Sequence, residues 1–309
     1  SAGTQVGLFI EGGPLDSGQY RFTANATLED RAANALDGNG DGTGGDAYQQ
    51  FFTVALPSGL VFEGDNNDTL ATATALPLVE DPAGSGYYTG RGQGVIDPAE
   101  PCGTSSSYYW TDSDWWRFEA LAGDLVSVSM DTPDSALDPY MVVYNAGGST
   151  LLADNNAGPD SDAFISRYVI PTSGTYYVRA GKYNRSCVSG SYQLRVDLAR
   201  GIDLETDANY ANDSINNADP VTLAEAGITR SGTVAGTIML PTGANTDEDC
   251  FDLGLLNVGN VVELDLCLPS TSSLAGRLRL LDADGNEVAD EDGDPSDDHF
   301  LATLTADGA

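Results

Sequence analysis

Acidic and amide side chains gather in three parts of this sequence, at spacings that suit a metal ion. The first is a glycine-rich loop in which oxygen-bearing side chains stand at alternate positions, Asp37, Asn39 and Asp41, before Asp46 ends the loop. The glycines between them allow tight reversal of the backbone. Calcium takes six to eight oxygen ligands at ~2.3–2.6 Å and is commonly held by flexible loops. We therefore predict calcium binding here; the alternative is an acidic hairpin turn without an ion.

The other two parts are copies of one pattern. Each has a leading cluster of acidic and amide residues and, farther along the chain, an Asp-x-Asp or equivalent pair directly before an aromatic residue. Carboxylates this dense repel one another unless a cation or solvent separates them. We predict a calcium site in each copy, the alternative being a solvated acidic surface adapted to high salt. The candidate ligands are Glu63, Asp65, Asn67, Asp68, Asp112 and Asp114 in the first copy, and Glu205, Asp207, Asn212, Asp213, Asp247 and Asp249 in the second.

Other chemistry has little support in the sequence. His299 is the only histidine and lies in an acidic loop, so catalytic arrangements that need histidine depend on it alone. Zinc would need further histidines or a cysteine cluster. We therefore expect no enzymatic activity. The aromatic loop formed by Tyr108, Tyr109 and Trp110 is a candidate ligand surface for a glycan or an extended peptide.

Four cysteines are consistent with export, and none forms a CxxC pair. Four cysteines allow three connectivities. Pairing within each half is the simplest arrangement, giving a Cys102–Cys187 disulfide and a Cys250–Cys267 disulfide that would staple a hairpin. The alternative is four free thiols in a cytosolic protein.

Charge and composition exclude several classes of protein. The chain has 309 residues, with 47 Asp+Glu against 13 Lys+Arg, for a formal net charge of −34. A nucleic-acid binder needs a basic face, and anchorage to anionic lipid needs clustered lysine or arginine. No apolar stretch approaches the ~20 residues of a membrane span. We expect an acidic, secreted or cell-surface (extracellular) protein without nucleic-acid partners.

Most of the chain has the two-residue period of β-strands, bounded by Gly, Pro, Asn and Asp. Short strands at this spacing are typical of β-sandwiches. Helical periodicity is nearly absent, apart from single turns at residues 69–75 and 214–218. The predicted strands cover residues 5–10, 18–27, 48–55, 125–130, 140–144, 168–170, 175–180 and 192–197.

An internal repeat divides the chain. The sequence NDTL from residue 67 recurs as NDSI from residue 212, and TDSDWW from residue 111 recurs as TDEDCF from residue 246. The first copy covers residues 60–199. The second covers residues 202–309 and is expected to lack its last strands, which we interpret as a hairpin. In the aromatic strand, Trp116 and Phe118 share one face and are predicted core residues, with Trp115 on the other face.

This repeat resembles the bacterial pre-peptidase C-terminal (PPC) domain, whose relatives include the collagen-binding domains of clostridial collagenases. The resemblance implies jelly-roll-like β-sandwiches in tandem, an all-β fold, with calcium at the junction of linker and sandwich. It also implies a non-catalytic accessory role in a large secreted protein. Residues 1–57 are similar to the C-terminal half of bacterial Ig-like domains. The residues that carry the PPC resemblance are Glu63-x-Asp65-x-Asn67-Asp68, Asp112-x-Asp114-Trp-Trp-x-Phe118, the LAGD turn at 121–124, and Pro171-x-x-Gly174-Thr-Tyr-Tyr-Val178.

Three functions are compatible with these observations. One is an adhesion module that holds a parent enzyme or cell to an extracellular matrix polymer. Another is a structural subunit of an extracellular filament, sheath or surface layer, in which neighbouring subunits supply the absent strands by β-strand addition in a head-to-tail homopolymer. The third is the C-terminal accessory region of a secreted peptidase. A chain truncated at both ends is the simpler account of the absent strands.

Overall fold

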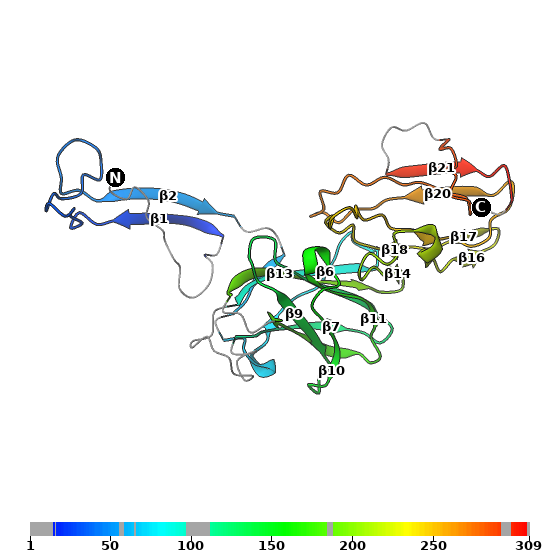
Figure 1. The fold of residues 1–309 in the computed structure, drawn as a ribbon, viewed down its shortest axis with the longest axis horizontal. Helices are drawn as coiled ribbons and strands as arrows, with labels where there is room; N and C mark the ends of the chain where they lie inside the picture. The colour runs from blue at the N-terminus through cyan, green and yellow to red at the C-terminus, as the bar shows by residue number, and fades with distance from the viewer. Residues whose placement is uncertain are drawn as a thin grey trace. The chain divides into compact units, whose positions relative to one another are not determined.

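The computed structural model describes residues 15, 17–55, 59–64, 66–96, 112–183, 188–291 and 298–307. It divides into two compact units, Ser1–Asp65 and Asn66–Ala309. The described residues form strands and short 3-10 turns without an α-helix (Figure 1), which confirms the all-β fold class. None of their helical segments has the length and apolar character needed to cross a membrane. The two predicted helical turns are single 3-10 turns, η1 (Leu70–Thr72) and η4 (Ile215–Asn217).

The N-terminal unit contains an antiparallel hairpin formed by β1 (Gly18–Ala24) and β2 (Tyr48–Val54). The rings of Tyr20 and Phe52 stack across the hairpin with centroids 5.8 Å apart. The glycine-rich acidic loop lies in the connection between the two strands. A third strand, β3 (Leu60–Phe62), follows. The strand predicted at residues 5–10 lies outside the described residues, so the Ig-like assignment stays a prediction.

In the first copy, two sheets built mainly from antiparallel strand pairs pack face to face as a sandwich. Core and surface residues alternate along the strands, so each sheet buries one face against the other. The first sheet has the order β10-β9-β12-β7-β4, and the second runs β11-β8-β13-β6 with β5 paired to β6. The strands of the first sheet are β4 (Thr74–Ala75), β7 (Asp114–Ala120), β9 (Pro139–Tyr144), β10 (Thr150–Asp154) and β12 (Gly174–Lys182). Those of the second are β5 (Val79–Glu80), β6 (Tyr87–Ile96), β8 (Leu125–Asp131), β11 (Ala163–Val169) and β13 (Gly190–Ala199).

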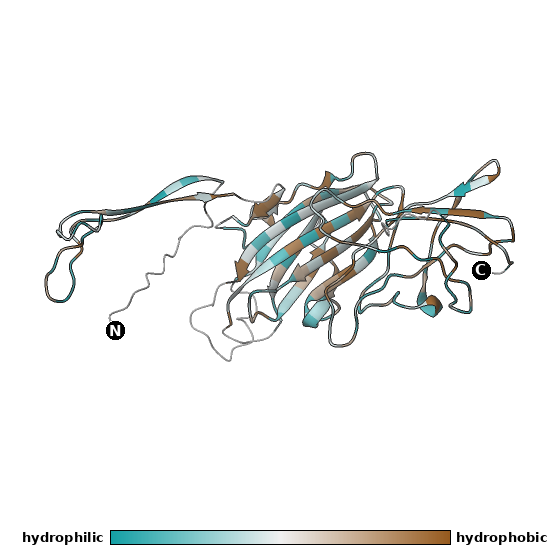
Figure 2. Ribbon diagram, turned by 90° about the horizontal axis from the view of Figure 1, so that it is seen from above, coloured by the Kyte–Doolittle hydropathy of each residue, from teal (hydrophilic) through white to brown (hydrophobic). Residues whose placement is uncertain are grey.

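The core lies between these sheets, and the hydropathy bands along the strands in Figure 2 follow the alternation. Trp116 is fully buried and Phe118 is 2% exposed, which confirms both as core residues. The indole Nε1 of Trp116, on β7, donates to Tyr192 Oη, on β13, at 2.9 Å, so a hydrogen bond joins the two sheets. Gly92 faces the indole ring, and a Cβ there would lie 2.8 Å from it.

The last two strands of the first copy lie in different sheets, which corrects the expectation of a hairpin. Strand β12 pairs with β7 and β9, whereas β13 pairs with β6 and β8. Each strand therefore occupies the middle of its own sheet. The two strands are consecutive in sequence, but their backbones bond to different neighbours.

The second copy has shorter strands, which pair two by two as β14-β18, β15-β19, β16-β17 and β20-β21. A small apolar core forms around Val262 and Phe300. The strands are β14 (Asp203–Leu204), β15 (Asp219–Pro220), β16 (Ala224–Ala226), β17 (Thr229–Ser231), β18 (Val234–Ala235), β19 (Phe251–Asp252), β20 (Val261–Asp265) and β21 (His299–Thr303). The division into residues 1–57, 60–199 and 202–309 stays a prediction.

The predicted Cys250–Cys267 disulfide is wrong, because both thiols are free. Cys250 directly precedes β19, which pairs with β15, whereas Cys267 follows β20, which pairs with β21. The two residues therefore flank different strand pairs rather than the two arms of one hairpin. The predicted Cys102–Cys187 disulfide lies outside the described residues.

Candidate metal centre

Three segments of the second copy meet at a cluster of acidic side chains. Glu205 and Asp207 follow β14, Asn212 and Asp213 precede η4, and Asp247 and Asp249 precede β19. Carboxylate oxygens of Asp207, Asp247 and Asp249 lie within 4.8 Å of one another.

The backbone brings the second and third segments together. Cys250 N donates to Asn212 O at 3.0 Å, and β15 continues this contact as a parallel pair in which Asp219 faces Phe251. Asp247 adopts a left-handed conformation (φ 60°), which aspartate tolerates better than most residues. The fold therefore brings Asp207, Asp247 and Asp249 together, three of the six residues predicted as ligands of the second copy, and their role as metal ligands stays a prediction.

The side chains of this cluster are buried, and too few N–H or O–H groups donate hydrogen bonds to their oxygens. Asp207 and Asn212 are fully buried, and Glu205 is 2% exposed. Among the described residues, neither carboxylate oxygen of Asp207 has a hydrogen-bond partner, and neither Asn212 Oδ1 nor Glu205 Oε2 has one. One oxygen each of Asp213, Asp247 and Asp249 shares this condition. An ionised carboxylate buried without a partner is strongly disfavoured, and a cation between such groups would offset that cost.

Other oxygens of the cluster are fixed by backbone amides. Thr237 N donates to Glu205 Oε1, and Met239 N donates to Asp247 Oδ2. A Cβ at Gly236 would overlap the Glu205 carboxylate, so only glycine leaves room for it. Each of these two carboxylates therefore has one oxygen bonded to the backbone and one without a hydrogen-bond partner among the described residues.

Burial and mutual repulsion raise the pKa values of these carboxylates. Burial raises the pKa of Glu205 to about 11, with a further contribution from the charge of Asp249. It raises the pKa of Asp207 to about 8, where Asp247 adds to the effect. The pKa of Asp249 is raised to about 7 and that of Asp247 to about 6, in both cases mainly by burial. A divalent cation would compete with those protons.

The first copy repeats the framework of this centre. Trp115 N donates to Asn67 O at 2.8 Å, as Cys250 does to Asn212, and the parallel pair of Thr74 with Trp116 corresponds to that of Asp219 with Phe251. Asn67 and Asp114 are buried, and Tyr192 Oη donates to Asp114 Oδ2 at 2.7 Å. The structure therefore brings Asn67 near the Asp114 segment.

Within its described residues, the structure does not bring the remaining predicted ligands of the first copy into one cluster. Asp112 is half-buried ahead of β7, and Asp68 is exposed. Glu63 belongs to the N-terminal unit. Asp65 lies outside the described residues, and so do the candidate ligand residues Tyr108, Tyr109 and Trp110.

The glycine-rich loop brings three of its four predicted ligands together. Carboxylate oxygens of Asp37, Asp41 and Asp46 lie within 4.8 Å of one another, and Asp46 Oδ2 is buried without a hydrogen-bond partner in the described part of the chain. Asp37 accepts hydrogen bonds from the amides of residues 40, 41 and 42 at 2.7–3.1 Å. Asn39 is exposed, and its Nδ2 donates to Asp41 Oδ2 at 3.1 Å. Much of the loop is thus organised by its own hydrogen bonds.

His299 lies on β21, partly exposed. Its Nε2 is 3.5 Å from Glu263 Oε1 and 3.9 Å from Asp265 Oδ1. These are surface carboxylates, with side chains 66% and 68% exposed. His299 therefore begins a strand rather than lying in the expected acidic loop, and it is partly exposed as a surface residue would be.

Comparisons with known proteins give one family match and several similar solved structures. Residues 112–182 match the family model of the bacterial pre-peptidase C-terminal domain. The chain is similar to the pre-peptidase C-terminal domain of a collagenase from Bacillus anthracis, with 13% identity and a TM-score of 0.27 over 40% of this chain and 93% of that one. It is also similar to PliG, a periplasmic inhibitor of g-type lysozyme.

For PliG from Aeromonas hydrophila the identity is 16% and the TM-score 0.27, covering 41% of this chain and 96% of that one. For PliG from Salmonella Typhimurium the values are 18% and 0.27, covering 41% and 99%. The search of curated proteins found no match. The match to the bacterial pre-peptidase C-terminal domain thus covers residues 112–182, within the first copy.

Proposed function

We propose that this chain is a non-catalytic, calcium-stabilised accessory region of a larger secreted or cell-surface protein. The observation that carries calcium binding is Asp207, which is fully buried beside Asp247 and Asp249 with no hydrogen-bond partner for either carboxylate oxygen among the described residues. Such an arrangement is costly for the apoprotein and favourable for a cation complex.

The donor set favours calcium among common metal ions. All six predicted ligands of the second copy offer carboxylate or amide oxygen, which suits hard cations, whereas zinc and copper favour nitrogen or sulfur. Calcium accepts six to eight such oxygens, whereas magnesium usually keeps several waters. When bound, the ion would supply the positive charge that joins the segment after β14 to the segment before β19. An ion that binds only the folded state stabilises it by about 2.7 kcal/mol at a hundredfold excess over the dissociation constant.

The pre-peptidase C-terminal domain supports the accessory role, because domains of this family are typically C-terminal modules of secreted peptidases. The outer face of the first sheet supports adhesion to a matrix polymer. There the rings of Trp115 and Tyr144 lie 4.8 Å apart, and the Arg179 guanidinium lies 5.6 Å from the Trp115 ring. Trp115 is half-buried, so its ring is the part of this cluster that could stack against a sugar or an extended peptide, whereas Tyr144 beside it is buried.

Calcium titration of the full chain by calorimetry tests the metal centre. Asp247→Asn keeps the shape and the left-handed backbone but removes one ligand charge, so the number of calcium ions bound per chain should fall. Glu248→Gln is the matched control, because Glu248 is exposed and faces Arg279 at 3.3 Å. An unchanged stoichiometry in Asp247→Asn would refute this site.

Light scattering in millimolar calcium and then in chelator tests the accessory role. A monomer in both conditions supports it. A calcium-dependent polymer would instead favour a structural subunit.

A further inference from the structure

The ligand-bearing segment of the second copy is tied to the first copy by backbone contacts. Ser166 Oγ, on β11, donates to Glu205 O at 3.2 Å and accepts a hydrogen bond from Asp207 N at 2.8 Å. Farther along, Asn209 N donates to Ala157 O at 2.8 Å. One serine of the first copy therefore bonds to the backbone of two candidate metal ligands of the second.

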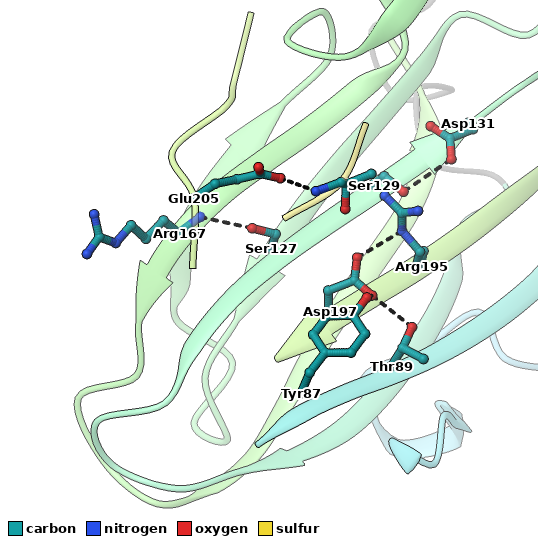
Figure 3. Close-up of polar contacts among 10 residues, drawn as sticks. Tyr87, Thr89, Ser127, Ser129, Asp131, Arg167, Arg195, Asp197 and Glu205 are labelled. Atoms are coloured by element: carbon teal, nitrogen blue, oxygen red, sulfur yellow. Dashed lines mark hydrogen bonds and ion pairs between the residues drawn. The ribbon is translucent and has the colours of Figure 1, made fainter. Parts of the chain in front are cut away.

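Ser166 is aimed at this segment by a β-bulge. The ladder between β11 and β8 shifts register between Ile165 and Tyr168, so Ser166 and Arg167 together face Ser127. Arg167 has a left-handed backbone (φ 48°), which is uncommon for a residue other than glycine, and its N–H donates to Ser127 Oγ at 3.1 Å (Figure 3). Bulges redirect side chains at functional sites, and an observed backbone outlier is a reason to look for a function.

The bulge also contributes a charge contact to the same segment. The Arg167 guanidinium lies 3.8 Å from Asp203 Oδ1, at the start of β14. Both bulge residues therefore contact the strand that leads into the metal centre.

A second contact between the copies is apolar and includes a residue whose backbone N–H bonds to another candidate ligand. Ala157 and Phe164 of the first copy form a small core with Met239 of the second, and Ala208 and Tyr210 pack against it. Met239 N is the group that donates to Asp247. The packing of the two copies is therefore connected directly to the third ligand segment.

The first copy also supplies a positive charge near Glu205. In Figure 3, Glu205 lies over the sheet face that carries Asp131 and Arg195. Arg195 Nε is 2.9 Å from Asp197 Oδ2, and Arg195 interacts electrostatically with both Asp131 and Glu205. The arginine thus lies among three carboxylates, one of which belongs to the second copy.

We propose that the metal centre of the second copy is built across both copies, with the Ser166–Arg167 bulge as its positioning element. This inference rests on the calcium site proposed above. Ser166 holds the backbone of residues 205–207 in the arrangement that binds the ion, so ion binding and docking of the two copies form one coupled equilibrium. Coupling of this kind is reciprocal: calcium strengthens docking by the same factor by which docking strengthens calcium binding.

Hydrogen exchange of the full chain, followed over a calcium titration, tests the inference. The readout is the calcium concentration that gives half-maximal protection of residues 203–213. In Ser166→Ala this midpoint should rise about five- to tenfold, in the usual range of coupling between two sites. Ser166→Thr keeps the hydroxyl and should restore the midpoint. Ser173→Ala is the matched control, because Ser173 Oγ accepts a hydrogen bond from Ala122 N at 2.9 Å within the first copy.

The outcomes separate the inference from the proposed function. If calcium leaves the protection of residues 203–213 unchanged in the parent chain, the calcium site itself is refuted. If calcium protects them with the same midpoint in the parent chain and in Ser166→Ala, the site stands and the coupling is refuted. In the parent chain, calcium should also protect residues 157–166 of the first copy. Thermal melts of each variant in chelator confirm that it is folded.

Discussion

Replacing Asp207 by asparagine should lower the stability of the protein in calcium without lowering it in chelator. The side chain is fully buried, and neither of its oxygens has a hydrogen-bond partner among the described residues. In chelator, the change replaces a buried carboxyl group, whose ionised form repels Asp247 and Asp249, by a neutral amide. The variant should therefore be at least as stable as the parent chain in chelator. In calcium it loses a ligand charge and with it much of the stabilisation that the ion provides.

The magnitude in calcium follows from mass action. At calcium a hundredfold above the dissociation constant, the ion contributes about 2.7 kcal/mol to the parent chain. For a domain of this size, 1 kcal/mol shifts the Tm by roughly 2–4 °C, so loss of the site lowers the Tm by about 5–10 °C. Parallel thermal melts by circular dichroism, in millimolar calcium and in chelator, measure both effects. An equal loss of stability in the two conditions would refute a metal-binding role and assign Asp207 to apoprotein structure.

Four further results are expected. Without metal, the stability of the protein should fall as the pH rises from about 4 to 8. The reason is that the raised pKa of Asp207 makes the folded state bind more protons than the unfolded state in that window. Melts in chelator in which stability rises with pH would contradict the burial of Asp207. Asp112→Asn should lower the Tm in calcium and hardly in chelator, and equal losses would exclude it as a ligand. Gly92→Ala should cost about 1–3 kcal/mol in a denaturant melt, because its Cβ would meet the Trp116 ring at 2.8 Å; an unchanged midpoint would show that the core repacks. Cys267 is free and exposed, so it should react with a thiol reagent in the native protein, whereas resistance would indicate a disulfide.

The strand content could be predicted from the sequence, and so could the gathering of Asp207, Asp247 and Asp249 in one cluster. In a strand, alternate side chains point to opposite faces, and this depends only on local backbone geometry. The alternation around Trp116 and Phe118 therefore indicates which side chains of that strand enter the core. The repeat also pairs Asn67 with Asn212 and Asp114 with Asp249. In each copy the residue after that aspartate, Trp115 or Cys250, donates its backbone N–H to the asparagine carbonyl, since equal spacing along the chain imposes equal geometry.

Contacts between residues far apart in sequence could not be predicted. Tyr192 holds Asp114 from the opposite sheet, across 78 residues, and its position depends on how β13 lies beside β6 and β8. The expected hairpin of the last two strands fails for the same reason, because adjacency along the chain does not decide which sheet a strand joins. The Cys250–Cys267 pairing rested on that same assumption of adjacency.

The sequence by itself determined which residue types are available: carboxylate and amide oxygens in two matching copies, alternating strands, and a strongly acidic composition. Only the tertiary structure decided which oxygens are buried without donors and that Ser166, on a bulge of the first copy, bonds to the ligand segment of the second. The physical reason is that composition and periodicity are local properties of the chain. Burial and a missing hydrogen-bond donor depend on what packs against a residue from elsewhere in the fold.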